Sequence, residues 1–370
     1  MKKLNELAEL GQAIWLDYIQ RSFLASGEMQ NLINLGVRGM TSNPSIFEKA
    51  IAGSSDYDTD LAELISSGLG VEEIYEVLAI DDIQNAADLL LPVFENTSGA
   101  DGYVSLEVNP NLAHDTDGTL TDALRLWQAV DRPNLMIKIP ATKEGIPAIQ
   151  RSIGAGLNVN VTLIFSRERY AEVIEAYLSG LEDRLAAGHP IDHIASVASF
   201  FISRLDTKID HALMDILDRN PALKEEVNPL LGHAAVANAK LAYQQFLSEF
   251  SSIRYKELST RGAQVQRPLW ASTSTKNPAY ADILYVQELI GPRTVNTVPQ
   301  ETLDAFLDHG DVRVTIDDGL VQAQQSLSAM EKLGISLSKA AQELEDEGVA
   351  AFAKSFASLM DSIAAKQGNL

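Results

Sequence analysis

The chain contains no cysteine, and this absence removes several kinds of chemistry at once. A protein without thiols has no disulfide framework, no catalytic thiolate and no cysteine-ligated zinc site. Positive charge is also scarce, because 29 Lys and Arg residues stand against 51 Asp and Glu residues and leave a formal net charge of −22 at pH 7. A surface this acidic repels phosphate backbones and anionic lipids, so we expect neither nucleic acid nor a membrane as a partner.

Long apolar runs are missing as well. No stretch of the sequence reaches the roughly 18 apolar residues of a membrane helix, and the N-terminal segment MKKLNELAELGQ has no apolar centre like that of a secretory signal. Hydrophobic residues nevertheless make up 46% of the 370 residues, which is enough for a large core. We therefore expect a soluble, cytoplasmic protein.

Short apolar runs of strand length recur along the chain, and segments of helical periodicity lie between them. Strands that alternate with helices pair in parallel through right-handed crossovers. The apolar runs occupy residues 14–19, 37–43, 103–108, 135–140, 158–165, 194–202, 267–273 and 293–298, and helical patterns cover residues 27–36, 119–130, 145–154, 167–188 and 281–290.

This order predicts an α/β fold in which residues 1–370 form a single (β/α)8 TIM barrel. Residues near 54–97 and 204–262 contain only helical patterns and are predicted as helical insertions, and a helical C-terminal tail begins near residue 320. An open, doubly wound sheet is the alternative. Its dinucleotide-binding fingerprint is missing, because Gly154 and Gly156 precede a predicted strand and the third glycine is absent.

Three predicted strands each carry one ionisable residue, namely Asp17, Glu107 and Lys138. Parallel strands are covered on both faces, so a charge within one is costly unless it pairs, changes its protonation state or takes part in chemistry. The simpler explanation is that these side chains reach solvent or pair with one another. Because all three lie near the C-terminal ends of different strands, where a barrel has its active site, we favour a catalytic group.

Lys138 is the most informative of the three, because it lies between Ile137 and Ile139. Burial there disfavours the ammonium form, and a neutral amine is the form that attacks a carbonyl to make a Schiff base. Lys143, beside Glu144 in a predicted loop or first helical turn, serves as a comparison, and we expect it to be a solvated charge. A lysine with two carboxylates also suits the proton transfers of carbon–carbon bond cleavage.

Polar side chains alternate with apolar ones along residues 158–165. Asn158, Asn160 and Thr162 share one face of this predicted strand, and the apolar residues between them share the other. On its own, an edge strand facing solvent explains the pattern equally well. Next to three buried charges, a wall of hydrogen-bonding groups for a polyhydroxylated substrate is the better interpretation.

These residues occur in segments that resemble the transaldolase family. The matching segments are WLDYIQRSF, GMTSNPSIF, YVSLEVNP, LMIKIPATKEGI, GLNVNVTLIFS, ASFFISRLD and WASTSTKNPAY, which follow one another from residue 14 to about residue 280. The resemblance implies an enzyme without metal or organic cofactor that acts on small sugar phosphates as a monomer or homodimer. It would move a dihydroxyacetone unit from sedoheptulose 7-phosphate or fructose 6-phosphate to glyceraldehyde 3-phosphate or erythrose 4-phosphate, in the non-oxidative pentose phosphate pathway.

The resemblance also implies roles for the three charged residues. Lys138 matches the lysine that forms the Schiff base. Glu107 matches the carboxylate that works through a water when the imine forms and when it is hydrolysed. Asp17 matches the base that takes the proton of the donor's C4 hydroxyl and later returns it.

Five further positions match substrate-binding residues of the family. Asn43 and Asn160 match residues that hydrogen-bond the dihydroxyacetone portion of the substrate. Thr162 matches the residue that orients the water. Ser199 and Arg204 match part of the phosphate and hydroxyl site.

The phosphate site departs from the family pattern. Where many members have a Ser-x-Arg pair, this chain reads WASTSTK, so Lys276 replaces the arginine as a point charge, and either Ser272 or Ser274 is its partner. Smaller relatives that release free dihydroxyacetone carry Gln at the Glu107 position and Tyr at the Phe201 position. Glu107 and Phe201 therefore favour transfer over simple aldol cleavage.

One segment imitates an unrelated catalytic motif. Residues 115–122, DTDGTLTD, look like the nucleophile loop of haloacid-dehalogenase-type phosphatases, which needs its first aspartate at the end of an apolar strand. The preceding residues EVNPNLAH are not such a strand. We predict a polar loop and a helix capped at Thr119 or Thr121.

Metal sites are also predicted to be absent. Asp56, Asp58 and Asp60 have the first spacing of a calcium loop without its later glycine and glutamate, and an acidic helix start explains them better. His189 and His193 have no evident third ligand. A sugar-phosphate-binding barrel without catalysis is the remaining alternative, and the intact set of one lysine and two carboxylates argues against it.

Overall fold

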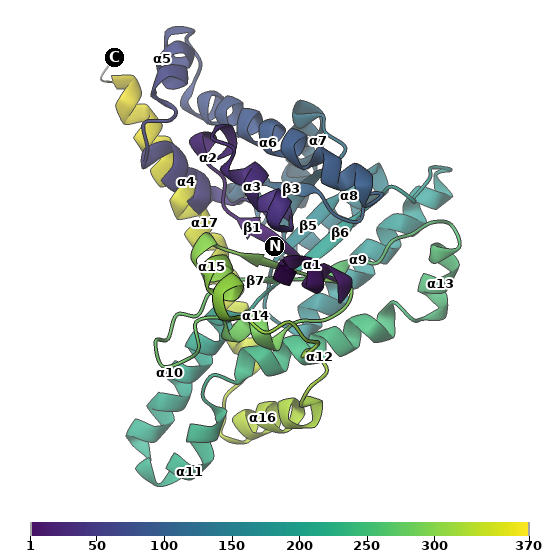
Figure 1. Ribbon diagram of the computed structural model, residues 1–370, viewed down its shortest axis with the longest axis vertical. Helices are drawn as coiled ribbons and strands as arrows, with labels where there is room; N and C mark the ends of the chain where they lie inside the picture. Colours follow the sequence, from purple (N-terminus) through teal and green to yellow (C-terminus); the bar gives the residue numbers. More distant parts are fainter. Residues whose placement is uncertain (1, 369–370) are drawn as a thin grey trace.

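Eight parallel strands close into a barrel in the computed structural model, which describes residues 2–368 (Figure 1). Each strand pairs with the next one along the chain, and β8 pairs with β1. This closed sheet confirms the predicted TIM barrel and excludes the open, doubly wound alternative. The strands are β1 (Gln12–Asp17), β2 (Val37–Thr41), β3 (Tyr103–Glu107), β4 (Leu135–Pro140), β5 (Val159–Ile164), β6 (Ser196–Phe201), β7 (Arg267–Ala271) and β8 (Thr294–Val298).

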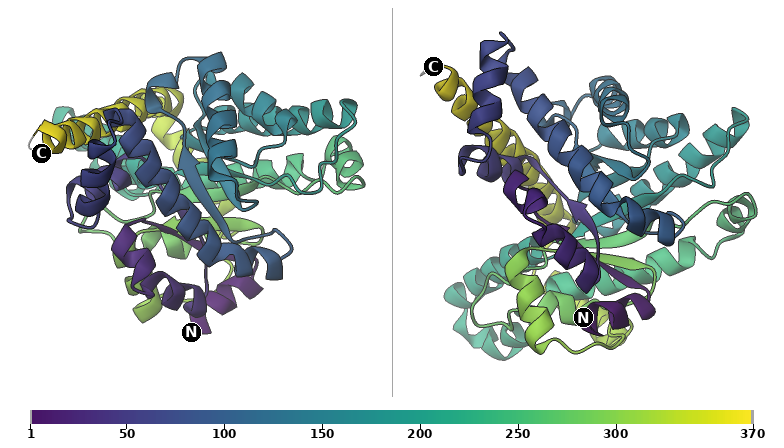
Figure 2. Two further views of the ribbon diagram at one scale, coloured as in Figure 1. Left: turned by 90° about the horizontal axis from the view of Figure 1, so that it is seen from above. Right: turned by 45° about the horizontal axis from the view of Figure 1, so that its top comes forward.

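Helices surround the barrel, and the two predicted insertions are helical (Figures 1 and 2). The first contains α5 and α6, between β2 and β3, and the second contains α10 to α13, between β6 and β7. The helices are α1 (Lys2–Glu9), α2 (Arg21–Ala25), α3 (Glu28–Leu35), α4 (Pro44–Ala52), α5 (Asp58–Ser66), α6 (Val71–Asn96), α7 (Thr116–Val130), α8 (Gly145–Ala155), α9 (Arg167–Ala186), α10 (Ser203–Arg219), α11 (Lys224–Val227), α12 (Ala234–Glu249), α13 (Ile253–Ser259), α14 (Leu284–Glu288), α15 (Gln300–His309), α16 (Leu320–Lys332) and α17 (Leu337–Gly368), with short 3-10 segments η1 (Pro110–Leu112), η2 (Pro221–Leu223) and η3 (Asn228–Leu230).

The start of α7 differs from the prediction. Neither Thr119 nor Thr121 caps the helix, because Asp115 precedes its first residue and accepts a hydrogen bond of 3.0 Å from the Gly118 N–H group. A carboxylate at the N-cap satisfies a free N–H group of the first turn. Asp115 follows the 3-10 segment η1 and not a strand, which removes the structural basis of the phosphatase interpretation.

The helix predicted at residues 281–290 is shorter than expected. Only α14 forms, since the Ile290 N–H group bonds to the Thr315 hydroxyl at 3.1 Å instead of to a carbonyl of the preceding turn. A contact with a distant segment therefore ends this helix early.

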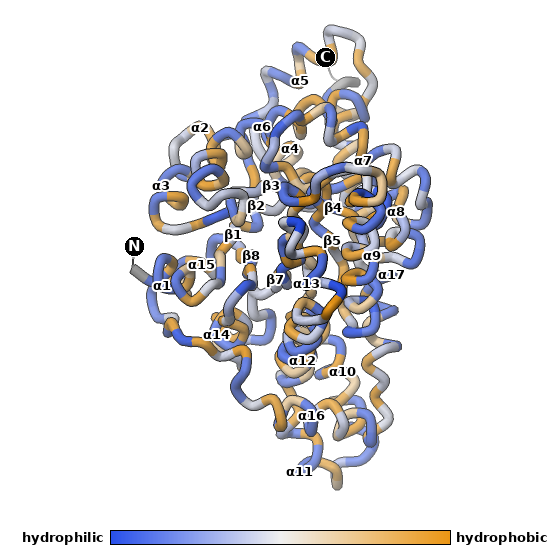
Figure 3. Tube along the Cα trace, turned by 90° about the vertical axis from the view of Figure 1, so that its right-hand side faces the viewer, coloured by the Kyte–Doolittle hydropathy of each residue, from blue (hydrophilic) through white to orange (hydrophobic). Residues whose placement is uncertain are grey.

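The strands form the most buried part of the molecule. Every residue of β3, β4, β5, β6 and β8 is buried, as expected for parallel strands that are covered on both faces. Around them, the traces of many helices alternate between hydrophobic and hydrophilic residues (Figure 3), so that each helix can turn an apolar side to the barrel. Within residues 2–368, no helix has the length and apolar composition that crossing a membrane requires.

The C-terminal helix α17 runs beside α4 and also contacts α6, α10 and β5 (Figures 1 and 2). Gly348 lies so close to β5 that a Cβ atom there would be 2.8 Å from the Leu163 side chain. Leu163 has a φ of 60°, and the pairing of β5 with β6 shifts register around it, so the predicted alternation along β5 ends at this residue. At the other end of α17, Lys366 forms an ion pair of 2.6 Å with Asp58 of α5.

Candidate active site

A cavity of about 320 Å³ lies at the C-terminal ends of the barrel strands. Parallel strands direct their C-terminal ends to one face, which is where residues far apart in the sequence can meet. All the predicted site residues line this cavity except Glu107, Asn158 and Asn160. Its side chains include Asp17, Thr41, Asn43, Ser45, Lys49, Lys138, Thr162, Ser199, Phe201, Arg204, Ser272, Ser274, Lys276, Thr297 and Phe352.

Lys138 lies on β4 with only 4% of its surface exposed. The register of β3 and β4 pairs it with Glu107, and its Nζ atom lies 3.2 Å from Glu107 Oε2. Nζ also donates a hydrogen bond of 3.0 Å to the Ser42 carbonyl and lies 5.6 Å from the centre of the Phe352 ring. In contrast, Lys143 is exposed in a turn, as predicted.

Glu107 is the last residue of β3 and is 8% exposed. Burial raises the pKa of the Glu107 carboxyl, while the neighbouring Lys138 ammonium opposes this shift and the Asp17 carboxylate adds to it. A raised pKa lets this carboxyl exchange protons closer to neutral pH than a solvated glutamate does. The Lys138–Glu107 pair can therefore combine an amine nucleophile with a proton carrier.

Asp17 ends β1 and is held in place by hydroxyl groups. Its Oδ1 atom accepts a hydrogen bond of 2.6 Å from Thr41 Oγ1, which in turn lies 2.7 Å from Thr297 Oγ1. These partners come from the neighbouring strands β2 and β8, so the barrel itself orients the carboxylate. A carboxylate held in one orientation is suited to act as a general base.

The polar stripe of β5 divides between two ends of the barrel. Asn158 does not reach the cavity, because its Nδ2 atom bonds to the Pro133 and Leu135 carbonyls and its Oδ1 accepts from the Ala195 N–H group. Its amide satisfies backbone groups between neighbouring strands. The prediction that Asn158 belongs to the substrate wall is therefore wrong.

The other two members of the stripe lie closer to the chemistry. Asn160 is fully buried under the cavity, where it donates to Ser105 Oγ at 3.0 Å and accepts from Ser199 Oγ at 2.7 Å. Ser199 itself lines the cavity, so Asn160 positions it. Thr162 lines the cavity as well, and its buried Oγ1 atom bonds to no other described residue.

Asn43 enters the cavity from the start of α4. Its side-chain oxygen accepts a hydrogen bond of 3.0 Å from the Ile46 N–H group and so caps the helix. This bond fixes the side chain and leaves the amide NH₂ group as a donor for a ligand.

Two unpaired cations border the cavity at its opening. Arg204 and Lys276 also line a neighbouring hollow of about 470 Å³ and form no ion pair with the residues described here. Burial lowers the pKa of the Arg204 guanidinium, whose Cζ atom lies 5.6 Å from the centre of the Phe201 ring. Positive charge without a carboxylate partner is available to bind an anion.

The serine partner of Lys276 is resolved by the structure. Lys276 Nζ donates a hydrogen bond of 2.6 Å to Ser274 Oγ. Ser272, which has a φ of 55°, instead places its Oγ atom 2.9 Å from Ser203 Oγ at the start of α10. Ser274 is thus the neighbour of the cation, and Ser272 ties the loop to α10.

Sequence reasoning missed several cavity residues. Thr41 and Ser45 flank Asn43 in a segment that was already singled out, so their positions carried a usable signal. Lys49 follows one helical turn after Ser45, and an amphipathic helix could have indicated it. Phe352 lies on the remote helix α17, and no local pattern distinguishes it from an ordinary core residue.

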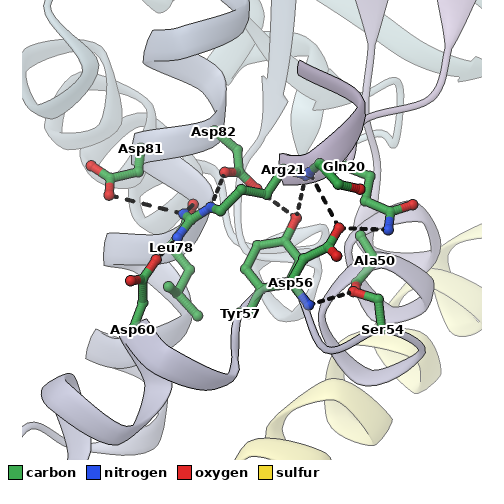
Figure 4. A network of polar contacts seen from close by, with 11 residues as sticks. Gln20, Arg21, Ala50, Ser54, Asp56, Tyr57, Asp60, Leu78, Asp81 and Asp82 are labelled. Carbon is green, nitrogen blue, oxygen red and sulfur yellow. Dashed lines mark hydrogen bonds and ion pairs between the residues drawn. The ribbon is translucent and has the colours of Figure 1, made fainter. Parts of the chain in front are cut away.

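A polar network anchors the segment that follows Asp17 (Figure 4). Arg21 donates to the fully buried Asp82 at 2.9 Å and pairs with Asp60, and Tyr57 donates to Asp82 at 2.7 Å. Burial raises the pKa of the Asp82 carboxyl, whereas Tyr57 and Arg21 stabilise its charged form. The network connects the end of β1 to α5 and α6.

The acidic residues with the first spacing of a calcium loop lie in the same region. Asp58 and Asp60 lie in the first turn of α5, which confirms the acidic helix start. Asp56 accepts from Gln20 at 2.7 Å, and His193 lies exposed beside Asp192. Among residues 2–368, no group of three His, Asp or Glu side chains is arranged to hold a metal ion.

Comparison with known proteins connects this cavity to a family. Residues 14–363 match the family model described as Transaldolase/Fructose-6-phosphate aldolase. A protein of Thermobifida fusca named Transaldolase is 50% identical over 363 residues, which cover 98% of this chain and 97% of the relative. A Transaldolase of Trichodesmium erythraeum is 47% identical over 368 residues, with coverage of 98% and 97%. Transaldolase 1 of Streptomyces avermitilis is 48% identical over 366 residues, with coverage of 98% and 95%.

Proposed function

Because this chain belongs to the transaldolase/fructose-6-phosphate aldolase family, we propose that it transfers a dihydroxyacetone unit between sugar phosphates through a Schiff base on Lys138. It is an enzyme of the transaldolase type. The proposed donors are sedoheptulose 7-phosphate and fructose 6-phosphate, and the acceptors are glyceraldehyde 3-phosphate and erythrose 4-phosphate. This reaction belongs to the cytoplasmic, non-oxidative pentose phosphate pathway. The observation that carries the proposal is the buried Lys138, which lines the substrate cavity and lies 3.2 Å from Glu107 Oε2.

Lys138 is the nucleophile of the proposed reaction. Its amine adds to the C2 carbonyl of the ketose, and the resulting carbinolamine loses water to give an iminium ion. Glu107 carries the protons of this step, since its raised pKa allows it to donate one to the departing hydroxyl group. Thr162 Oγ1, which is buried and lines the cavity, is available to orient the water.

Asp17 is the base for carbon–carbon cleavage. Its carboxylate removes the proton of the C4 hydroxyl, the C3–C4 bond breaks, and the electron pair moves into the iminium to leave an enamine on Lys138. The aldose phosphate then departs. A second aldose receives the enamine carbon at its carbonyl, Asp17 returns the proton, and water releases the new ketose. Thr41 holds one oxygen of Asp17, so the other can face the substrate.

The phosphate of either substrate binds at the opening of the cavity in this proposal. Arg204 and Lys276 supply two positive charges, and the exposed Lys49 of α4 supplies a third at the cavity wall. Local positive charge is needed because a chain of net charge −22 repels a phosphate dianion at long range. Ser274, bonded to Lys276, adds a hydroxyl group to this anion site.

A simple aldolase that releases dihydroxyacetone is the second candidate, because the matched family includes fructose-6-phosphate aldolases. Phe201 offers no hydroxyl group that could protonate the enamine, and Glu107 retains its carboxyl group. Both features support retention of the enamine until an acceptor arrives. With fructose 6-phosphate and no acceptor, we expect much less free dihydroxyacetone than product formed when erythrose 4-phosphate is present.

Borohydride trapping tests the Schiff base. Reduction in the presence of fructose 6-phosphate should leave a dihydroxyacetone-derived adduct on Lys138, which peptide mapping would locate. Lys138→Ala should abolish transfer because it removes the amine. Lys138→Arg should also abolish it, because a guanidinium stays protonated and cannot act as the nucleophile. Lys143→Ala is the matched control and should retain activity, since Lys143 is exposed in a turn. An adduct on Lys143, or transfer by Lys138→Ala, would overturn the assignment.

A further inference from the structure

A second cavity of about 350 Å³ lies outside β3, between α6 and α7. We call it the rear cavity and the substrate cavity the front cavity. The two share no lining residue. The walls of the rear cavity are Pro44, Glu72, Glu73, Tyr75, Glu76, Ala79, Ile80, Leu106, Glu107, Val108, Asn109, Pro110, Leu112, Asp122, Arg125, Leu126 and Phe356.

The two cavities approach each other at the ion pair between Glu107 and Lys138. Glu107 lines the rear cavity, Lys138 lines the front cavity, and their charged atoms are 3.2 Å apart. The same division recurs on α17, where Phe352 faces the front cavity and Phe356, one helical turn later, faces the rear. Glu107 therefore borders a cavity other than the one that Lys138 lines.

The entrances of the two cavities have opposite charge. The rear entrance carries the exposed Glu72 and Glu73, and its one arginine, Arg125, is neutralised by ion pairs with Glu76 and Asp122. Acidic groups repel sugar phosphates but admit neutral water. The front entrance carries the unpaired cations described above. Charge thus sorts an anionic substrate to the front cavity and excludes it from the rear.

Tyr75 and Glu107 both line the rear cavity. Tyr75 packs edge-on against Phe47 and Phe356, at ring distances of 6.0 and 5.4 Å. Burial raises the pKa of the Tyr75 hydroxyl, and the charge of Glu107 adds to this shift. Lys138 Nζ, at 3.2 Å, is the one polar neighbour of Glu107 Oε2 among the residues described, so the carboxyl group retains capacity for a water donor.

We propose that the rear cavity is the water route of the enzyme, through which the water of imine hydrolysis reaches Glu107 while the sugar phosphate fills the front cavity. This inference rests on the proposed function. In hydrolysis, the water oxygen bonds to the iminium carbon, one water proton goes to Glu107, and the C=N π electron pair becomes the lone pair of the Lys138 nitrogen. Glu107 then gives its proton to this nitrogen and takes the proton of the carbinolamine hydroxyl. The C2–N bond breaks, which releases the ketose and the Lys138 amine. Imine formation returns one water by the same path. Water thereby enters without passing the enamine face, where it would compete with the aldose.

The absence of cysteine permits a test on the folded enzyme. Ile80→Cys places a single thiol on the wall of the rear cavity, and Glu72→Cys places one at its entrance. Val77→Cys is the matched control, because Val77 lies on the same helix, is 38% exposed and does not line the cavity. Each variant is assayed before and after reaction with a bulky maleimide, so blocking follows folding.

The measurement is the enzyme-dependent exchange of ¹⁸O from water into C2 of fructose 6-phosphate, with Lys138→Ala as background. Labelling at Ile80→Cys or Glu72→Cys should slow exchange at least 10-fold while the KM for fructose 6-phosphate changes less than 2-fold, and labelling at Val77→Cys should have no effect. Unchanged exchange after both rear labels would overturn the water route. If the wild-type enzyme shows no exchange above background and no borohydride adduct, the proposed function itself fails.

Discussion

At the scale of single residues, the strongest physical constraint is the buried pair of Lys138 and Glu107. Both side chains are almost completely removed from water, because 6% of the side-chain surface of Lys138 and 4% of the side-chain surface of Glu107 are exposed. Two charges in such a place cost several kcal/mol to desolvate, roughly, and their attraction offsets this only with good geometry. Because burial of this pair costs stability, we interpret the pair as functional and assign it to proton transfer between the two groups.

Substitution of the two carboxylates should slow different steps of the reaction. Glu107→Gln removes the proton carrier, so imine formation and hydrolysis should slow by about 10²–10⁴-fold, the usual effect of a positioned acid or base. Asp17→Asn leaves that carrier intact, so the donor imine should form while carbon–carbon cleavage slows by a similar factor. Rapid quenching with borohydride measures the imine, and release of the aldose phosphate measures cleavage. A variant Asp17→Asn that forms no trappable imine would contradict this division of roles.

Asp206 predicts a pH dependence of stability. Burial raises its pKa to about 7, although the Ala235 N–H group donates to it at 2.7 Å. The folded state therefore binds a proton that the unfolded state releases near its ordinary pKa of 3.8, and the free energy of unfolding falls as pH rises from about 4 to 7. Asp206→Asn keeps the acceptor oxygen and removes this cost.

The stability advantage of Asp206→Asn over the wild type should grow by about 1–2 kcal/mol between pH 5.5 and pH 8. Urea unfolding at several pH values measures the difference. A difference that stays constant over this range would show that Asp206 is ionised in the folded protein throughout.

At the scale of elements, α10 and the loop after β7 form one anion-binding unit. Ser203 and Ser272 meet at 2.9 Å, and Tyr280 of the loop donates to Asp210 of α10 at 2.7 Å. These two contacts keep the loop that carries Lys276 against the helix that carries Arg204. The distance between the two cations is thus set by packing between elements and not by spacing in the sequence.

Arg204 should contribute more than Lys276 to phosphate binding. Arg204→Ala removes a charge-assisted fork and should cost about 2–3 kcal/mol in kcat/KM with glyceraldehyde 3-phosphate, against about 1–2 kcal/mol for Lys276→Ala. Phosphate binding energy positions the reacting carbons, so kcat should fall as KM rises. With unphosphorylated glyceraldehyde as the acceptor, both losses should be much smaller. Equal losses with the two acceptors would mean that these residues support the fold.

At the scale of the whole molecule, a barrel with two helical insertions and a long final helix can be one cooperative unit or several. The ion pair between Lys366 and Asp58 links α17 to the first insertion, and Gly348 packs against β5 of the barrel. These contacts connect the end of the chain to its first third. We therefore propose that residues 1–370 form a single domain.

A single domain should unfold in one transition. The three tryptophans, Trp15, Trp127 and Trp270, lie on β1, α7 and β7, so fluorescence reports the barrel and not the insertions. Far-UV circular dichroism reports all helices, including α10 to α13. Urea transitions from the two probes should coincide. Loss of helical signal at lower urea than the loss of native fluorescence would show that an insertion folds separately.

Much of this protein follows from local patterns. Apolar runs and helical periodicity located all eight strands, because burial on both faces makes the strands of a parallel sheet apolar. Lys138 was identified by the same reasoning, because a charge buried in an apolar strand is costly unless it pairs or takes part in chemistry. Local patterns also indicated Asp17 and Glu107 as strand-end carboxylates. Chemical type and place along a strand are properties that the sequence by itself determined.

Tertiary structure alone decided which groups touch. Phe352 approaches Lys138 across more than half of the chain, and Ser274 rather than Ser272 meets Lys276 because Ser272 turns to α10. Asn158 shares a periodicity with Thr162 but lies at the other end of the barrel, where its side-chain amide forms hydrogen bonds with backbone groups. The rear cavity also exists only where α6, α7 and α17 come together around Glu107. Periodicity orders neighbours along one segment, whereas contacts between segments depend on how closed strands and packed helices place them in space.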